Sequence, residues 1–587
     1  MANQVDFPDI YIDASVGSGG VGSEADPYSS FSEINWNSGG DNDISAYYAG
    51  TPSASVTINL KRGETFREYW QLYGGGSADY RLKIQAYGTG ELPIVSGASL
   101  VTGWTQCSAD GDIYKSSLST EPNQIWMDYT FGDRRDLLNV LGDGAQTLDN
   151  QYDWYWDEDG SVLDEEADTL YIWTGSGNDP DTYYDSPGVE AEQRQYCINT
   201  NLQNYIDIDG INISKARQWG LYLAESSHIT IKNCVLEWSW GDGVTEWQMF
   251  STPTDIIIED NISRYNGGTG IGNSVITGGG LSNFIIRRNT CYENGRHQEP
   301  HDYPCWDSGS HDFTSAIKVW SNDIVCSGIK IYENICYDNG PETEIFGDAQ
   351  KGNGIWVDQM FGADGDPVRV YNNLCRDNAG AGIFIEIARW AEVYGNVIYR
   401  CGTGSTSSSD YAAAGIRVDS RMGFIANNNK VCNNTIVDCY IGLHASSYGQ
   451  TGSSRFDDNT FKNNIVSGCT IALRCGNAAS NDGTWGSGNL YGNNCLGAEP
   501  VSLGWGASLY TTYDTWLAAA NSSEDIQPDN NIEDDASFTN TGSDDYSLAS
   551  DDPGIGEGEN LGQPFNTGIL PNSAWPDGVV TGDRGNY

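Results

Sequence analysis

The chain has 587 residues and a formal net charge of −51 at pH 7. A surface this acidic repels nucleic acids and anionic membranes, which we exclude as main partners. The sequence has no stretch of about 18 apolar residues, so we expect no membrane span. Its 71 glycines, together with frequent asparagine and aspartate, favour many short strands joined by tight turns over long helices.

Residues 1–115 are predicted to form an N-terminal cap and the first coils of a repeat. Stretches such as "SVTINLKRG" and "YRLKIQAYG" alternate apolar and polar residues in the way strands do. The opening "MANQVDFPDIYIDA" has neither the basic start nor the apolar core of a secretion signal. No signal peptide is visible, so either a signal has been removed or the protein leaves the cell by another route, as a virion part does at lysis. We expect an extracellular or virion-surface location.

Residues 116–200 differ from the rest, being aromatic and acidic with the turn signals of hairpins. We predict a small β-rich insertion here. Its stretch "DEDGSVLDEEAD" is rich in carboxylates but lacks the pattern of an EF-hand calcium loop. We therefore expect that no cofactor is required, and Ca2+ stays open as a ligand.

Residues 201–500 repeat a strand that ends in asparagine, at intervals of roughly 20 to 45 residues, a range typical of solenoids. The shared asparagines are Asn233, Asn261, Asn289, Asn334, Asn373, Asn396, Asn434 and Asn464. One such unit cannot bury its apolar side alone, so we predict an all-β parallel β-helix of stacked coils. Residues 501–587 are turn-rich and are predicted to form the last coils and a C-terminal cap.

The asparagines and cysteines of this repeat occupy columns of the predicted stack. Five residues after the shared asparagines come Asn266, Asn294, Asn339 and Asn378. We expect these four to adopt the left-handed turn conformation and to bond from coil to coil in ladders. Many of the 14 cysteines stand where other coils have isoleucine, valine or asparagine. We interpret them as buried thiols that pack as small apolar residues.

Five glycine- or alanine-led strands align in the main repeat, namely 316–320, 354–358, 382–386, 415–419 and 442–446. Their second and fourth residues are apolar, which places the third and fifth on the outer face. The outward stripe then holds Lys318, Trp320, Trp356, Asp358, Phe384, Glu386, Arg417, Asp419, His444 and Ser446.

The stripe brings carboxylates together. Strands in a sheet lie about 4.8 Å apart, so Asp358 should lie beside Glu386, with Asp419 one coil further. Pairs of acids are the working groups of glycosidases, at roughly 5 Å in retaining enzymes and roughly 6.5–9.5 Å in inverting ones. We predict Asp358 and Glu386 as the catalytic pair, and Asp419 as the rival partner. The competing interpretation is that each acid only forms a turn at a strand end.

The other side chains of the stripe are candidates for substrate binding. Aromatic rings are natural platforms for the apolar faces of sugars, and cations bind hydroxyls or an acidic sugar. The candidates are Lys318, Trp320, Trp356, Phe384, Arg417 and His444, together with His311 from the long insertion 296–315. Insertions 296–315, 340–353 and 402–414 are predicted to wall a groove.

The insertion "RHQEPHDYPCWDSGSHDF" holds His297, His301 and His311. Their spacing matches no zinc pattern, so the sequence leaves a metal site undefined. We expect a solvated loop that contributes one functional histidine.

The pair "GIWVD" and "GIFIE" resembles the paired motif of bacterial right-handed β-helix glycosidases, notably the β-xylosidase family. The resemblance implies a right-handed parallel β-helix, with Asp358 as the nucleophile and Glu386 as the general acid/base. The architecture also resembles bacteriophage tailspike depolymerases. That second resemblance implies a host surface glycan as partner, a virion location and a homotrimer.

Three functions remain open at this level. The first is hydrolysis of a poly- or oligosaccharide by the carboxylate pair. The second is a polysaccharide lyase that uses Lys318 as base and Arg417 as acid, although three strand spacings, about 14 Å, separate them. The third is a non-catalytic glycan-binding adhesin or structural spike.

Overall fold

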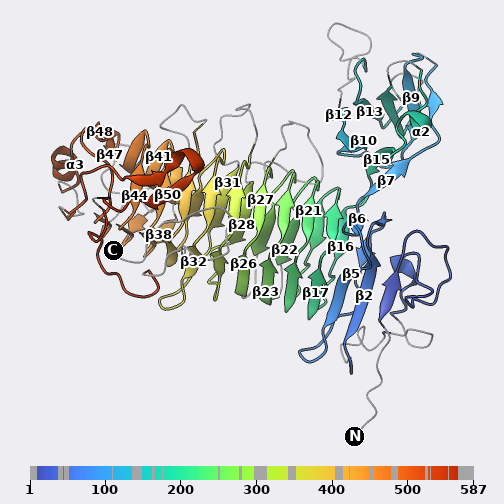
Figure 1. The fold of residues 1–587 in the computed structure, drawn as a ribbon, viewed down its shortest axis with the longest axis horizontal. Coiled ribbons are helices and arrows are strands. Elements are labelled where there is room, and N and C mark those ends of the chain that lie inside the picture. Colours follow the sequence, from blue (N-terminus) through green and yellow to red (C-terminus); the bar gives the residue numbers. More distant parts are fainter. Residues whose placement is uncertain are drawn as a thin grey trace.

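The structure is a computed structural model. It describes residues 9–36, 44, 52–108, 110–134, 148–160, 166–174, 177–248, 251–275, 280–295, 314–340, 352–403, 414–421, 424–448, 455–476, 487–521, 527–528, 530–552 and 554–565. Three long sheets run the length of an elongated molecule (Figure 1). The predicted all-β parallel β-helix with a β-rich insertion is confirmed.

Sheet 1 is parallel throughout and contributes one strand to each coil. Its strands in order are β1 (Ile10–Ile12), β2 (Val56–Lys61), β5 (Leu82–Tyr87), β17 (Ile206–Asp209), β20 (Ile229–Lys232), β23 (Thr254–Glu259), β26 (Ser282–Arg287), β29 (Lys330–Tyr332), β32 (Val368–Tyr371), β35 (Ala391–Tyr394), β39 (Lys430–Cys432), β43 (Thr460–Lys462) and β46 (Leu490–Gly492).

Sheet 2 is also parallel and its strands are short. They are β3 (Thr65–Phe66), β6 (Ile94–Ser96), β18 (Asn212–Ser214), β21 (Val235–Glu237), β24 (Ile262–Arg264), β27 (Thr290–Tyr292), β30 (Ile335–Tyr337), β33 (Leu374–Arg376), β36 (Val397–Tyr399), β40 (Thr435–Val437) and β44 (Ile465–Ser467).

Sheet 3 contains the glycine-led strands, and only its last pair is antiparallel among the pairings described. Its strands are β4 (Trp70–Gln71), β16 (Tyr196–Asn199), β19 (Trp219–Tyr222), β22 (Val244–Gln248), β25 (Ile271–Val275), β28 (Ser315–Ser321), β31 (Asn353–Asp358), β34 (Ile383–Glu386), β37 (Ala414–Arg421), β41 (Ile441–Tyr448), β45 (Ile471–Cys475), β47 (Leu503–Trp505) and β48 (Ser508–Tyr510).

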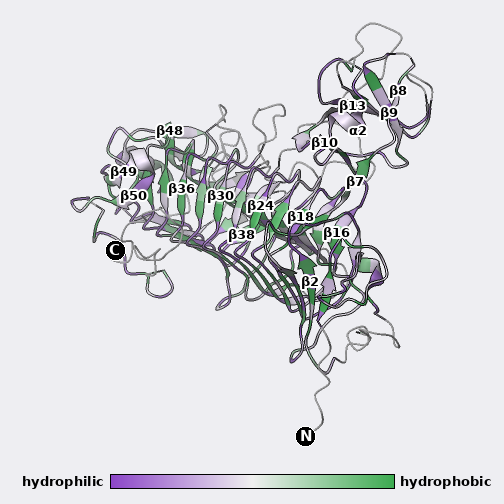
Figure 2. Cartoon of the chain, turned by 45° about the vertical axis from the view of Figure 1, so that its right-hand side comes forward, coloured by the Kyte–Doolittle hydropathy of each residue, from purple (hydrophilic) through white to green (hydrophobic). Residues whose placement is uncertain are grey.

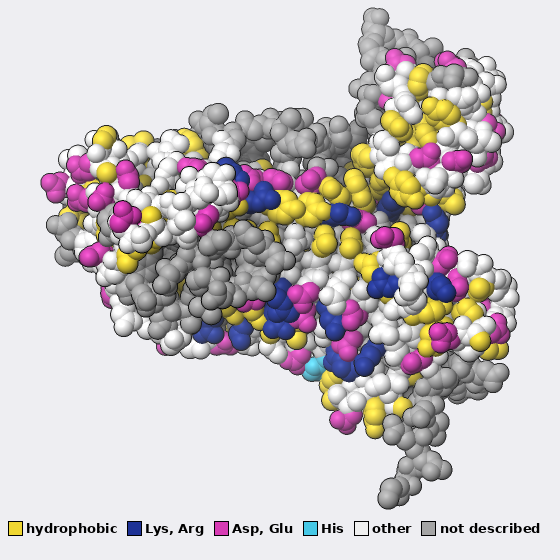
Figure 3. Space-filling model, in the orientation of Figure 1, with side chains coloured by type: hydrophobic (Ala, Val, Ile, Leu, Met, Phe, Trp, Pro, Cys, Tyr) yellow, Lys and Arg dark blue, Asp and Glu magenta, His cyan; other side chains and the backbone are white. Residues whose placement is uncertain are grey.

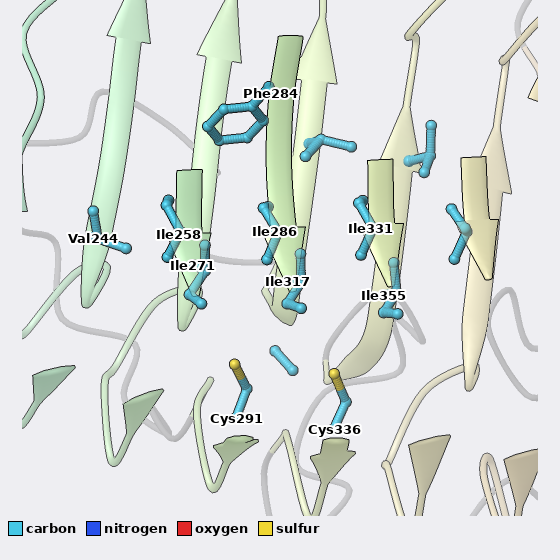
Figure 4. Packing of buried hydrophobic residues seen from close by; sticks show 14 of the residues in the cluster. Val244, Ile258, Ile271, Phe284, Ile286, Cys291, Ile317, Ile331, Cys336 and Ile355 are labelled. Carbon is cyan, nitrogen blue, oxygen red and sulfur yellow. The ribbon is translucent and has the colours of Figure 1, made fainter. Parts of the chain in front are cut away.

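The core lies inside the coils, where the three sheets meet. In Figure 4, Ile258, Ile286 and Ile331 of sheet 1 stack in one row, facing Ile317 of sheet 3 and Cys291 of sheet 2. These side chains are fully buried. Each row repeats an apolar residue at the strand spacing, so every coil buries its neighbour's apolar side. Figure 2 shows the resulting pattern of hydrophobic strands and hydrophilic turns.

Asparagine ladders join the coils at their turns. Asn334, for example, donates from Nδ2 to Oδ1 of Asn373 at 3.0 Å and to the carbonyl of Ile286 at 3.0 Å. Its own Oδ1 accepts from the backbone N–H and Nδ2 of Asn289. The same pattern links Asn261, Asn289, Asn334, Asn373, Asn396, Asn434, Asn464, Asn494 and Asn531.

Two details of the asparagine prediction were wrong. Asn266, Asn294, Asn339 and Asn378 do form a ladder. The left-handed residue is the one before each of them, as at Tyr265 and Asp338, because the ladder side chain must point inward while the backbone turns. In the ladder of the shared asparagines, Asn233 occupies the left-handed position of the earliest coil. Cys234 stands at the ladder position and its backbone N–H donates to Asn261 Oδ1 at 2.9 Å.

The cysteine prediction is confirmed for the part of the chain that the structure describes. All of the described cysteines are free thiols, and all except the partly buried Cys469 are buried. Cys291, Cys336 and Cys375 form one inward column. Burial raises the pKa of Cys336 well above its ordinary value, so these thiols act as apolar packing groups rather than nucleophiles.

A separate lobe leaves the solenoid between β6 and β16 (Figure 1). One of its sheets orders β11 (Thr130–Phe131), β10 (Ile125–Met127), β15 (Val189–Glu192) and β7 (Ala98–Val101); the other orders β12 (Asp133–Arg134), β13 (Asp153–Asp157), β14 (Thr169–Trp173), β9 (Ile113–Ser117) and β8 (Thr105–Gln106). The short helix α2 (Pro180–Tyr183) precedes β15.

At the far end, helix α3 (Tyr513–Ala520) packs on the last strands of sheet 3, with Trp516 Nε1 donating to the Gly504 carbonyl at 3.3 Å. The hairpin β49 (Phe538–Asn540) and β50 (Asp545–Leu548) then returns along the outside of the coils, where Arg400 pairs with Asp544 at 2.7 Å. Among the described residues, no helix has the length and apolar character needed to cross a membrane.

The ladder makes a testable prediction. We expect Asn334→Ala to lower the free energy of unfolding by about 2–4 kcal/mol, because buried amide and carbonyl groups of the neighbouring coils lose their partners. Chemical denaturation measures this loss. The control is Asn540→Ala, at an exposed position of β49, which should change stability by less than about 0.5 kcal/mol. Equal, small effects of both substitutions would contradict the proposed importance of the ladder.

Candidate active site

The three carboxylates lie in one column of sheet 3. Asp358 of β31 is in register with Glu386 of β34, which is in register with Asp419 of β37. A second, parallel column runs through Lys318, Trp356, Phe384, Arg417 and His444. The alignment of the glycine-led strands made from the sequence therefore has the right register.

The stripe faces outward but is not exposed, which corrects the sequence-based expectation. Asp358 is 7% exposed and Glu386 3%, while Trp356 and Phe384 are fully buried. Contacts between neighbouring side chains contribute to this burial, because adjacent strands lie only about 4.8 Å apart. The rings of Trp356 and Phe384 stack with centroids 5.2 Å apart. The aromatic pair therefore forms a packed wall beside the acids instead of an open platform.

Lys318 links the two columns. Its Nζ lies 3.1 Å from Oδ2 of Asp358 and 3.7 Å from the centroid of the Trp356 ring. An ammonium group at this distance stabilises the ionised form of the carboxylate. The side chain of Lys318 is only partly exposed, so solvent screens this pair less than a surface pair.

Arg417 holds the third carboxylate. Its Nη2 donates to Asp419 Oδ2 at 3.0 Å and to the Ser446 hydroxyl at 3.1 Å, and its guanidinium lies 5.2 Å from the centre of the Phe384 ring. Asp419 and Arg417 are both buried. Asp419 therefore belongs to an ion pair that orients Arg417.

The remaining candidates have different surroundings. Trp320 is partly buried in the acid column, in register with Asp358. His444 is buried next to Arg417, and burial together with the charges of Arg417 and Arg474 lowers its pKa well below the ordinary value. His311 lies outside the described residues. So do most of the insertions that were predicted to wall a groove.

The sequence analysis missed Asp242, which lies in the turn before β22. Gly272 has no side chain, and a Cβ at that position would lie 3.3 Å from Asp242 Oδ2. Gly272 is in register with Lys318, so Asp242 reaches the stripe through the gap that the glycine leaves. Burial raises the pKa of Asp242 to about 6, against the opposing effects of the Thr269 N–H, the Thr245 hydroxyl and Lys318.

The geometry therefore defines a column of adjacent carboxylates, flanked by aromatic rings and supported by one lysine and one arginine. Such a set can stabilise positive charge at a reacting carbon and exchange a proton with a leaving group. Among the described residues, no group of His, Cys, Asp and Glu has the arrangement of a metal site.

Comparisons with known proteins agree with this architecture. A profile described as a right handed beta helix region matches residues 196–412. The solved complex of XylC with xylose is similar over 78% of this chain and 76% of its own, at 14% identity and a TM-score of 0.50. A structure described as a glycoside hydrolase is similar over 79% of this chain and 96% of its own, at 11% identity and a TM-score of 0.49. The pectate lyase Pel9A is similar over 98% of this chain and 97% of its own, at 12% identity and a TM-score of 0.40.

A search of curated proteins gave no match. At these identities the structural likeness shows the fold alone, which is a right-handed parallel β-helix. A fold alone does not decide which chemistry a protein performs.

The raised pKa of Asp242 predicts a pH-dependent stability. Its unfolded pKa is about 3.9, so between about pH 4 and 6 the folded protein holds a proton that the unfolded chain has released. Stability from this group therefore falls as pH rises through that interval. We expect Asp242→Asn to be more stable than wild type by about 1–3 kcal/mol at pH 8 and nearly equal to it at pH 4.

Denaturant unfolding at the two pH values measures this difference, with Asp364→Asn as the control at an exposed aspartate. A loss of stability at pH 8 in the Asp242 variant would show that the ionised carboxylate is favourably held.

Proposed function

We propose that this protein hydrolyses glycosidic bonds of a poly- or oligosaccharide, with Asp358 and Glu386 as the catalytic carboxylates. The observation that carries the proposal is their register on adjacent strands, with Lys318 Nζ 3.1 Å from Asp358. A shift of one residue in either strand would turn one acid into the core. The XylC–xylose complex and the glycoside hydrolase that share this fold support a sugar substrate.

The two acids have different surroundings, which suggests different roles. Lys318 favours the ionised form of Asp358, the form that a nucleophile or charge-stabilising group needs. Glu386 would then be the general acid that protonates the leaving oxygen and later the base that activates water. Strands about 4.8 Å apart suit the roughly 5–5.5 Å carboxyl separation of retaining enzymes.

Asp419 is the weaker candidate for the second catalytic carboxylate beside Asp358. Because it is 3.0 Å from Arg417 and fully buried, its carboxylate is already engaged in an ion pair. We propose that it positions Arg417, whose guanidinium covers Phe384 beside the reacting bond. Inversion with Asp358 and Asp419 would require this ion pair to open.

The lyase alternative has less support. A lysine base must have its nitrogen free to take a proton from the substrate, but the Nζ of Lys318 is engaged with Oδ2 of Asp358 at 3.1 Å. Lys318 and Arg417 also remain three strands apart in the register. Hydrolysis therefore fits the site better.

A glycan panel tests the proposal. We expect Asp358→Asn and Glu386→Gln each to lower kcat by about 10²–10⁴-fold on a substrate that wild type cleaves, because each removes a group that acts in the transition state. Newly formed reducing ends measure hydrolysis, and ultraviolet absorbance of an unsaturated product would instead reveal a lyase. Asp364→Asn is the matched control and should keep full activity.

Full activity in both active-site variants would overturn the carboxylate pair. Binding of a glycan without any cleavage by wild type would favour the adhesin. NMR of the anomer that is released first shows whether Glu386 or Asp419 acts together with Asp358 as the second catalytic carboxylate. Retention is expected for Glu386, and inversion would point to Asp419. The virion location, the homotrimer and calcium binding stay predictions, the trimer being testable by light scattering.

A further inference from the structure

Beyond the acids, the second column of the stripe continues as a run of basic side chains. Arg417 is in register with His444 of β41, and His444 with Arg474 of β45. Their exposed fractions are 2%, 4% and 1%. Leu473 and Cys475, which flank Arg474, point into the core, so Arg474 points to the outer face.

Arg474 differs from the basic side chains on the molecular surface. In Figure 3, blue lysine and arginine side chains lie among magenta acids. Arg287 pairs with Glu259, and Arg264 pairs with Glu237. Arg474 has no ion pair within the described part of the chain, and its buried Nε and Nη1 have no hydrogen-bond partner. His444, its neighbour in the column, is buried as well.

A buried cation without a counter-ion destabilises the folded state, because burial removes its hydration and no acceptor replaces the lost hydrogen bonds of its N–H groups. The cost is visible in the lowered pKa of Arg474, for which burial is the main cause. The chain nonetheless makes room for this residue. Gly504 follows it in the column, and a Cβ at Gly504 would lie 3.0 Å from the Arg474 Cγ.

We propose that Arg474 and His444, next to Arg417, bind a single anionic substituent of the glycan, either a uronate carboxylate or a sulfate ester. Guanidinium groups match both oxyanions with paired N–H donors. The site lies three strand spacings, about 14 Å, from Glu386. The anionic group therefore belongs to a sugar unit separated from the cleaved bond, and this part of the inference rests on the proposed function.

The net charge of the protein also limits the class of glycan that it can bind. A net charge of −51 repels a polymer that is acidic at every unit. One enclosed guanidinium, shielded from water and salt, can still bind one anionic group strongly. The expected ligand is thus a mainly neutral oligosaccharide with an isolated acidic substituent.

The first test uses the full-length protein and small anions. At constant ionic strength, sodium glucuronate or sodium sulfate should raise the Tm of wild type above its value in sodium chloride, and Arg474→Met should abolish the response. Arg62→Met, at a partly exposed arginine of the N-terminal coils, is the control and should keep it. A response to glucuronate alone indicates a uronate ligand, and a response to sulfate alone indicates a sulfate ester.

Stability separates binding from a structural role. If Arg474 is held for a ligand, Arg474→Met removes an unpaired buried charge and should not lower the Tm in chloride. A lower Tm in that variant and in Arg474→Gln would overturn the proposal, as would equal Tm values of wild type in all three salts. Arg474→Gln also keeps the test valid should the methionine variant fail to fold.

The second test measures affinity without cleavage. In the Asp358→Asn background, xylotetraose that carries one glucuronic acid should bind about 10- to 100-fold more tightly than plain xylotetraose, and Arg474→Met should remove that preference. Equal affinities for the two sugars would contradict the subsite on this backbone. The two proposals can fail separately. If Asp358 and Glu386 prove dispensable for cleavage but the anions still raise the Tm through Arg474, the anion subsite stands and only the proposed hydrolysis is overturned.

Discussion

The asparagine ladders are the interaction on which the rest of this structure depends. Each ladder side chain bonds the next asparagine and backbone groups of the adjacent coils, as Asn334 does with Asn289, Asn373 and the Ile286 carbonyl. Buried amides left without these partners would cost free energy at every coil. The ladders thus fix the register from coil to coil, and the columns of sheet 3, including Asp358 and Glu386, follow from that register.

A fixed register also constrains what can share a column. Identical or similar side chains in one column lie in contact at the strand spacing. Aromatic rings gain free energy there by stacking, whereas carboxylates repel one another unless cations lie nearby. The stripe meets this condition by placing its cations in the neighbouring column, Lys318 next to Asp358 and Arg417 next to Asp419. The cations that make neighbouring acids tolerable therefore also hold the side chains of Asp358 and Asp419 in place.

The sequence predicts the coils and the columns because both follow from strict strand alternation and from the recurring asparagine. It does not predict burial of the stripe, because contacts between rings of different coils, such as Trp356 and Phe384, appear only when the coils stack. Asp242 escaped because it reaches the stripe only through the missing side chain of Gly272. Arg474 escaped because the strand alignment made from the sequence ended at residues 442–446, although Ala472 leads the next strand as Ala316 leads the first.

The stacked strands of sheet 3 provide regularly spaced outward positions. Which reaction the surface can catalyse depends on the residue types that occupy adjacent positions. Adjacent acids allow a proton donor and a nucleophile to act on one glycosidic bond, whereas a lysine and an arginine three strands apart cannot share one proton-transfer centre. The same regular spacing explains why a basic group further along the column can act on the substrate without taking part in bond cleavage. Under the proposed function, distance along the solenoid axis would correspond to position along the glycan, so substitutions near β31 and β34 should change kcat and those near β45 should change binding.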